Sequence, residues 1–538
     1  MGKVLSVAAQ HLLAHFLHLI RGPPAIAHPQ PASIINVPTD VLHTILDFLL
    51  AMFTENQLGY RTYFWDEEPS CGARLIPLSG TCRYLREQTR PRIFREVSNW
   101  SKGAPRADVW PDALWPFIVE VTLRDRSVRH PNPIALSANV LAAIPLMPSL
   151  NKVILHLEIP VPAQLLLALS LAPQLSSLEI LQARLDCPLP PLAPLPFPSL
   201  QNLILCVWKF TAVVTTRDVV PEVERENVAV ILRSVCDRLT TLNISGDLLS
   251  SKFLPIHWPH LRKFTVTEHT PTPFLTVSDV TAQMPALQEL AVLYSADLSR
   301  PAGELRPPFT LGVPGGRLLT EGSPRLTSVT LANLKPDDPV FRQLPSTLEA
   351  LHVVATWDLY IPEPSAPKQT QESPLTPLVE LTLTLDHFPT PDLIKIVSDA
   401  FPYLRFLELG NSRYRSADEL VEDVRDFAHV ESLSRLTSLS RLRISLYFWE
   451  REPTHVQRAV NQNAAGWFLI HLPTLKSISF SYQRWSSWTP FFELERTTWA
   501  TYLRTDFPVG WEPPVSRPHV PNESDEVIII PPRIPIGY

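Results

Sequence analysis

The stretch Pro402-Tyr403-Leu404-Arg405-Phe406-Leu407-Glu408-Leu409 is the clearest copy of a unit that recurs along the chain. The unit has the form P-x-L-x-x-L-x-L, with apolar residues at relative positions 0, 3 and 5. Its last two apolar positions alternate with other residues, which is the period of a strand that buries one face. One such strand cannot bury its own apolar face, whereas a stack of strands can.

The chain contains thirteen copies of this apolar triplet, with first positions 22 to 39 residues apart. In nine copies a proline stands two residues before the first position, where it stops a preceding helix from continuing. The copies are Ile118-Val121-Leu123, Leu150-Val153-Leu155, Leu175-Leu178-Ile180, Leu200-Leu203-Leu205, Leu239-Leu242-Ile244, Leu261-Phe264-Val266, Leu287-Leu290-Val292, Leu326-Val329-Leu331, Leu348-Leu351-Val353, Leu378-Leu381-Leu383, Leu404-Leu407-Leu409, Leu439-Leu442-Ile444 and Leu475-Ile478-Phe480. The unit resembles the leucine-rich repeat over roughly residues 116–490. This resemblance implies an α/β solenoid, and the irregular spacing predicts an uneven one with long insertions.

Composition bounds the class of protein. A chain of 538 residues is too long for one compact core, so several domains or one elongated array are expected. The net charge of −6 is close to neutral for this length and gives no reason to expect a nucleic-acid partner. The five cysteines are scattered without a C-x-x-C pair, which predicts reduced thiols in the cytosol or nucleus and no zinc site.

The N-terminal residues 1–33 carry an apolar run, Val4 to Ile20, that has two interpretations. It could be a signal peptide, but polar residues such as Gln10 and His15 interrupt it and no clear cleavage site follows. We favour a poorly ordered or amphipathic leader with a proline-containing linker. The run is also short for a membrane span.

Residues 35–53 change character and predict a helix. Thr39 or Asp40 can cap its start, with Pro38 just outside. One apolar face is expected, formed by Val41, Leu42, Ile45, Phe48, Leu49 and Met52. A second helical segment begins near Leu78, and Arg90-Pro91-Arg92-Ile93-Phe94-Arg95-Glu96-Val97 follows it.

Residues 35–97 together resemble an F-box, of the kind abundant in fungi. The resemblance rests on I-N-V-P-T-D-V-L-H-T-I-L-D-F-L, then L-S-G-T-C-R-Y-L-R and the ending R-P-R-I-F-R-E-V. The chain departs from the family in having Val37 where leucine is usual and in an insertion from Thr54 to Arg74. The alternative is a plain helical cap on the first repeat. A cap predicts that Ile45 and Phe48 face inward against Trp100 or Trp110.

The two resemblances predict four regions. They are a leader at 1–33, an F-box-like helical domain at 34–98 with an inserted loop at 54–74, a leucine-rich-repeat solenoid at 99–508 and a proline-rich tail at 509–538. The resemblance implies a substrate-recognition adaptor of an SCF-type (Skp–cullin–F-box) ubiquitin ligase, which binds the Skp adaptor, through it a cullin, and an unidentified target protein. The expected Skp contacts are Val37, Pro38, Val41, Leu42, Ile45, Phe48, Leu49, Leu78, Cys82 and Leu85. The alternative function is an interaction scaffold without ligase association.

The sequence contains no recognised catalytic, cofactor-binding or metal-binding motif, so a non-catalytic protein without a cofactor is expected. The concave face of the solenoid is then the expected binding surface for the target. Its candidate residues near the C-terminal end are Glu380, Thr382, Phe406, Glu408, Arg441 and Arg443. A nearby aromatic cluster, Tyr447, Phe448, Trp449, Tyr482, Trp485 and Trp488, either contacts a partner or caps the last repeat.

Overall fold

The computed structural model divides into two compact units, residues 1–200 (unit 1) and 201–538 (unit 2), which we describe separately. The structure describes residues 38–58, 75–98, 111–124, 138–157, 160–181, 184–185, 195–206, 222–268, 277–294, 324–332, 344–354 except 346, 378–385, 391–411, 427–444, 465–482 and 498–504. The leader 1–33, Val37 and the tail 509–538 lie outside these residues.

The first described part of unit 1 contains three helices that share one apolar core. They are α2 (Thr39–Leu58), α3 (Ile76–Ser79) and α4 (Arg83–Ile93). Their buried side chains are Leu42, Leu46, Leu75, Leu78 and Leu85. The predicted single apolar face of α2 was incomplete, because Leu46 is fully buried and was not assigned to it. The helix also continues to Leu58, beyond the expected start of the insertion at Thr54.

Polar contacts fix α2 against α4. Arg92 Nε donates a hydrogen bond to Asp47 Oδ1 at 2.8 Å, and His43 Nε2 lies 2.7 Å from Gln88 Oε1. The hydrogen bond from Arg92 lowers the pKa of the Asp47 carboxyl below its ordinary value. Both contacts join residues 45 positions apart. They therefore set the rotation of α2 about its axis and decide which of its side chains remain outside.

The rest of unit 1 is a parallel sheet with helices in its connections. The strands are β1 (Glu96–Ser98), β2 (Glu120–Arg124), β3 (Lys152–His156) and β4 (Ser177–Leu181), paired in that order. The connecting helices are η3 (Asp112–Phe117), α5 (Ala138–Ala143), η5 (Ile144–Leu146) and α6 (Ala163–Ser170). Arg90 in α4 donates to the Ala113 carbonyl and stacks on Phe117, which joins the three helices to η3.

Unit 2 continues the same pattern of strands and connections. Its parallel strands are β5 (Asn202–Cys206), β6 (Thr241–Ser245), β7 (Lys263–Glu268), β8 (Glu289–Tyr294), β9 (Ser328–Ala332), β10 (Ala350–Val354), β11 (Glu380–Leu385), β12 (Phe406–Asn411), β13 (Arg441–Ile444) and β14 (Ser477–Tyr482). A last strand, β15 (Thr498–Leu503), pairs antiparallel with β14. The helices are α7 (Glu222–Val235), η6 (Gly246–Leu248), η7 (Ser251–Phe253), α8 (Val277–Thr281), α10 (Pro391–Ala400), α11 (Phe427–Ser434) and one at 465–471.

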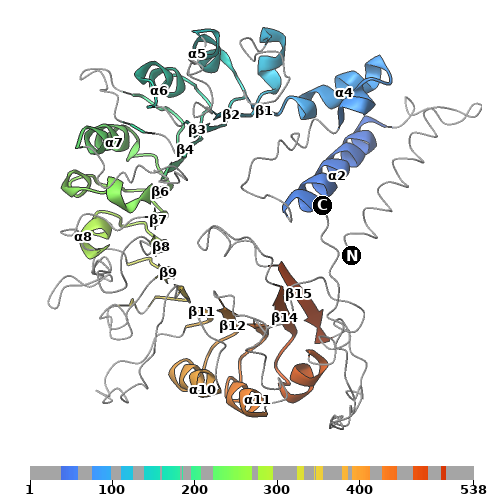
Figure 1. Cartoon of the computed structure of the whole chain (residues 1–538), viewed down its shortest axis with the longest axis vertical. Helices are drawn as coiled ribbons and strands as arrows, with labels where there is room; N and C mark the ends of the chain where they lie inside the picture. Colours follow the sequence, from blue (N-terminus) through green and yellow to red (C-terminus); the bar gives the residue numbers. More distant parts are fainter. Residues whose placement is uncertain are drawn as a thin grey trace, which may run out of the picture. The chain divides into compact units, whose positions relative to one another are not determined.

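Strand register places equivalent apolar residues side by side. Leu351, Leu381, Leu407, Leu442 and Ile478 are successive partners on β10 to β14, and all are buried. Helices α7 and α8 cover one face of β6 to β8, and α10 and α11 cover the corresponding face of β11 to β13 (Figure 1). Repeating strand–connection units with in-register parallel strands define a leucine-rich-repeat α/β solenoid, and every predicted triplet contributes one strand. The face opposite the helices is called the concave face below.

Two strands of the sheet were not predicted. Strand β1 pairs with β2, so the sheet begins at Glu96 rather than at residue 99. Strand β15 carries no apolar triplet and closes the sheet in the opposite direction. Helix α11, Phe427–Ser434, precedes β13, and residues 412–426 lie outside the described residues.

We predict that Leu242→Ala destabilises unit 2 by about 2–5 kcal/mol, because it opens a cavity where Leu203, Leu242 and Phe264 align. Thermal unfolding of the full chain measures the loss as a lower melting temperature. Thr241→Ala, on the same strand but facing the other way, is the matched control and changes the melting temperature little. Equal effects of the two substitutions would contradict the assignment of the buried face.

Candidate interaction surfaces

The ten expected Skp contacts fall into three groups. Leu42, Leu49, Leu78 and Leu85 are buried among the three helices and so are not available to a partner. Pro38, Val41 and Phe48 are exposed, and Ile45 and Cys82 are half-buried. Val37 lies outside the described residues.

The exposed members form an apolar stripe on one side of α2. Val41, Ile45 and Phe48 follow one another at helical spacing, one turn apart, so their side chains lie along the same line. Val41 is 44% exposed and Phe48 is 55% exposed, which is unusual for large apolar side chains. We call Val41, Ile45 and Phe48 the α2 stripe. The apolar residues predicted to share one face of α2 therefore lie on two faces, one buried in the helical core and one exposed to solvent.

Cys82 has a structural role in this region. Its backbone is extended, and its Sγ accepts a hydrogen bond from the Leu85 backbone N–H at 3.5 Å, which caps α4. The described cysteines Cys82, Cys206 and Cys236 form no disulfide with one another. Burial raises the pKa of the Cys236 thiol, and the nearby Asp237 carboxylate adds to this increase.

The six candidate target-binding residues meet on three adjacent strands of unit 2. Glu380, Phe406 and Arg441 are register partners on β11, β12 and β13. Thr382, Glu408 and Arg443 form the next row on the same strands. We call these six residues the concave patch. Their assembly follows from the repeat, because the same two positions of successive units face away from the helices.

Charge pairs and one aromatic ring hold the concave patch together. Arg441 Nη2 lies 2.9 Å from Glu380 Oε1 across the intervening strand, and Arg443 Nη1 lies 3.1 Å from Glu408 Oε2. Both guanidinium groups stack on Phe406, with their carbons 5.0 Å and 5.4 Å from the ring centroid. Arg441 remains 58% exposed, and exposed ion pairs contribute only about 0–1 kcal/mol each. Arg441 can therefore exchange Glu380 for a carboxylate of a bound protein at small cost, whereas the partner of Arg443, Glu408, is only 18% exposed.

His352 lies beside this patch on β10, as the register partner of Thr382. Burial lowers the pKa of His352 below its ordinary value of 6.5, and the carboxylates of Glu408 and Glu380 oppose this effect more weakly. The ring is therefore held neutral in the folded chain under conditions in which an exposed histidine begins to take up a proton.

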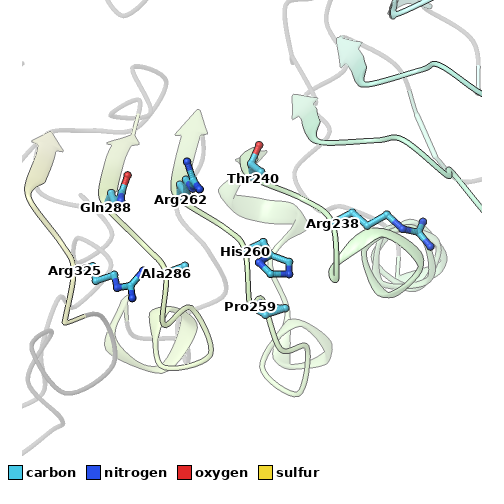
Figure 2. Close-up of a pocket in the computed structure, with 8 residues that line it drawn as sticks. All are labelled: Arg238, Thr240, Pro259, His260, Arg262, Ala286, Gln288 and Arg325. Carbon is cyan, nitrogen blue, oxygen red and sulfur yellow. The ribbon is translucent and has the colours of Figure 1, made fainter.

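A second feature of unit 2 is a pocket of about 300 Å³ at the rim of the sheet, where the chain enters the strands. Arg238 and Thr240 lead into β6, His260 and Arg262 lead into β7, Gln288 leads into β8 and Arg325 leads into β9. Figure 2 shows these residues on four neighbouring segments. The sequence alone does not reveal this pocket, because its residues are dispersed over 88 positions, from 238 to 325. Aligning the repeats on their first apolar position would have revealed them.

Other kinds of site find no support in the part of the chain that the structure describes. No group of three or more histidine, cysteine, aspartate or glutamate residues there is arranged to hold a metal ion. None of the described helices has the length and apolar character needed to span a membrane. The aromatic residues Tyr447, Phe448, Trp449, Trp485 and Trp488 lie outside the described residues, and Tyr482 is the last residue of β14.

No protein-family model matches the chain, and no curated protein matches it. Among solved structures, the chain is similar to the TLR13–ssRNA13 complex (TM-score 0.34, 16% identity, 72% of this chain and 43% of that chain). It is also similar to CroV588, described as a novel circular leucine-rich-repeat protein (TM-score 0.26, 12% identity, 69% and 47%). The chain thus spans less than half the length of both, and its assignment to the leucine-rich-repeat fold rests on its own strand register.

We predict that the folded chain loses stability as the pH falls from about 7.5 to about 5, in part through His352. The unfolded chain takes up a proton at this histidine near its ordinary pKa of 6.5, while burial keeps the folded ring neutral to lower pH. Acid therefore favours the unfolded state. Melting temperatures across this range should fall more steeply for the wild type than for His352→Gln. His471→Gln, at an exposed site, controls for loss of a histidine. Parallel curves for wild type and His352→Gln would exclude this contribution.

Proposed function

We propose that this chain is a non-catalytic interaction protein that holds a partner protein on the concave face of unit 2. The concave patch is the observation that carries the proposal. Arginine and aromatic side chains supply much of the binding energy at protein interfaces, and here two arginines flank one aromatic ring. Arg441 and Arg443 remain 58% and 44% exposed, whereas Phe406 lies buried against them, so the carboxylates of a partner can approach the two guanidinium groups.

We further propose that the chain is the substrate-recognition adaptor of an SCF-type ubiquitin ligase, with the α2 stripe bound to the Skp adaptor. The F-box resemblance suggests this function, and the exposure of the stripe supports it. A plain cap is expected to turn Phe48 inward, yet more than half of this side chain is exposed. In this proposal, partner proteins carry out ubiquitin transfer. The chain contributes proximity, because it raises the effective concentration of the target near the transferring enzyme.

The scaffold without ligase association remains the alternative, and it differs in one feature. Both functions use the concave patch, but only the adaptor function needs the α2 stripe to bind the Skp adaptor. The two surfaces can therefore be tested independently.

We predict that Val41→Ser/Phe48→Ser abolishes binding to the Skp adaptor while leaving the fold intact, because both side chains are largely exposed. Co-purification of the tagged full chain with the Skp adaptor and cullin measures this binding, and thermal unfolding verifies the fold. Val230→Ser/Ile396→Ser, at similarly exposed apolar positions on α7 and α10, is the matched control. If the wild type recovers neither protein, the ligase proposal fails and the scaffold remains.

We predict that Arg441→Glu/Arg443→Glu removes most of the proteins that co-purify with the wild-type chain, apart from the ligase subunits. Charge reversal places four carboxylates around Phe406 and repels an acidic partner. Quantitative mass spectrometry of purified complexes measures the change. Arg405→Glu/Lys476→Glu is the matched control, because it reverses two exposed charges in these repeats outside the concave patch. Identical sets of proteins for the wild type and the patch variant would rule out the patch as the binding surface.

A further inference from the structure

Among the described residues that line the rim pocket, several are basic and none is acidic. Its basic residues are Arg238, His260, Arg262 and Arg325, and all four are exposed. The rim pocket is therefore a local concentration of positive charge, and an anion is the ligand that suits it.

The repeat holds the backbone at these positions in a fixed arrangement. Each flanks the first apolar residue of its unit, and because Leu239, Leu261 and Leu326 are fully buried, their neighbours turn outward. The backbone is also tied across the rim, since the Arg262 N–H donates to the Thr240 carbonyl and the Gln288 N–H donates to the Arg262 carbonyl, both at 2.8 Å. The pocket floor is thus part of the sheet framework and does not need to form on binding.

The spacing of the strands suits one compact anion. Neighbouring strands lie about 4.8 Å apart, so β6 and β9 are separated by roughly 14 Å. In Figure 2, Arg238 and Arg325 stand at the two ends of the group, and His260 and Arg262 lie between them. The Arg325 side chain extends toward the group, whereas that of Arg238 points away from it and must turn inward to contact the same anion (Figure 2). Arginine binds phosphate with two parallel hydrogen bonds, and more than one can act on a single phosphate group.

The short extent of the basic cluster along the rim indicates what kind of molecule carries the phosphate. At the position equivalent to Arg262 on the entry to β10 stands an acid, Glu349, and another acid, Asp237, precedes Arg238. The cluster is therefore short, whereas a nucleic-acid backbone needs an extended basic track. Because the basic side chains are exposed at a rim, the pocket does not enclose a small molecule. A phosphate carried on another protein surface fits both constraints.

We propose that the rim pocket binds a phosphorylated side chain of a partner protein. This inference rests on the proposed function as an interaction protein, and it adds the chemical class of one contact. It does not depend on the ligase, since the pocket and the α2 stripe are in different units.

The test uses the purified full chain and arrays of peptides with random sequence around a fixed central phosphoserine, phosphothreonine or phosphotyrosine. Matched arrays carry the unphosphorylated residue. We expect binding to at least one phosphorylated array above its matched control, and competition by inorganic phosphate. Arg262→Ala should weaken binding about tenfold, and Arg238→Ala/Arg262→Ala/Arg325→Ala more strongly, because each charged hydrogen bond contributes roughly 1.4 kcal/mol or more. Arg405→Ala is the matched control, since Arg405 is exposed at the same repeat position outside the pocket.

Three results would overturn the proposal. The first is that no phosphorylated array binds more than its matched unphosphorylated array. The second is that the triple variant binds the phosphorylated arrays as well as the wild type does. The third is that the wild type binds a single-stranded RNA probe more tightly than any phosphopeptide and the triple variant loses this RNA binding. Thermal unfolding confirms that each variant is folded. Co-purification of the triple variant with the Skp adaptor distinguishes failure of the pocket from failure of the proposed ligase function. A variant that loses phosphopeptide binding but still binds the Skp adaptor has lost only the function of the pocket.

Discussion

The structure depends on in-register pairing of parallel strands, which stacks the same apolar positions of successive repeats. Pairing alone would not select this register, since a shift by one residue would move every leucine to the concave face. Burial selects it, because Leu381, Leu407 and Leu442 are removed from water only when they align. Each repeat therefore requires its neighbours, and the strands carry the stability that no single unit could supply.

The same register determines where function can reside. Alternate residues of every strand must face away from the core, so each repeat contributes to a common surface a few side chains that the core does not constrain. The concave patch uses this freedom on β11 to β13, where Arg441 crosses one strand to reach Glu380. The rim pocket uses a second set of positions, those flanking the first leucine. Residues distant in sequence thus meet without any special local structure.

The sequence predicts the strands well because the apolar triplet is a direct consequence of the burial that stabilises them. It misses β1 because Asn99 stands where the third apolar residue is expected, although Val97 pairs with Val121. It also cannot sort the apolar residues of α2. Val41 and Leu42 are equally apolar neighbours, and only packing against α3 and α4 buries Leu42 and leaves Val41 exposed. The contacts of Asp47 and His43 with α4 set this rotation, and they join residues too distant in sequence to be read from a pattern.

Hydrogen exchange of the full chain, measured peptide by peptide, tests the central claim that each repeat is stabilised by its neighbours. The informative variant is Leu407→Ala, at a fully buried position on β12. We predict faster exchange in β11, β12 and β13 and unchanged exchange in β6 to β8, because in a solenoid a local defect weakens only adjacent units. Equal acceleration throughout unit 2 would contradict it, since that result is expected of a single cooperative core.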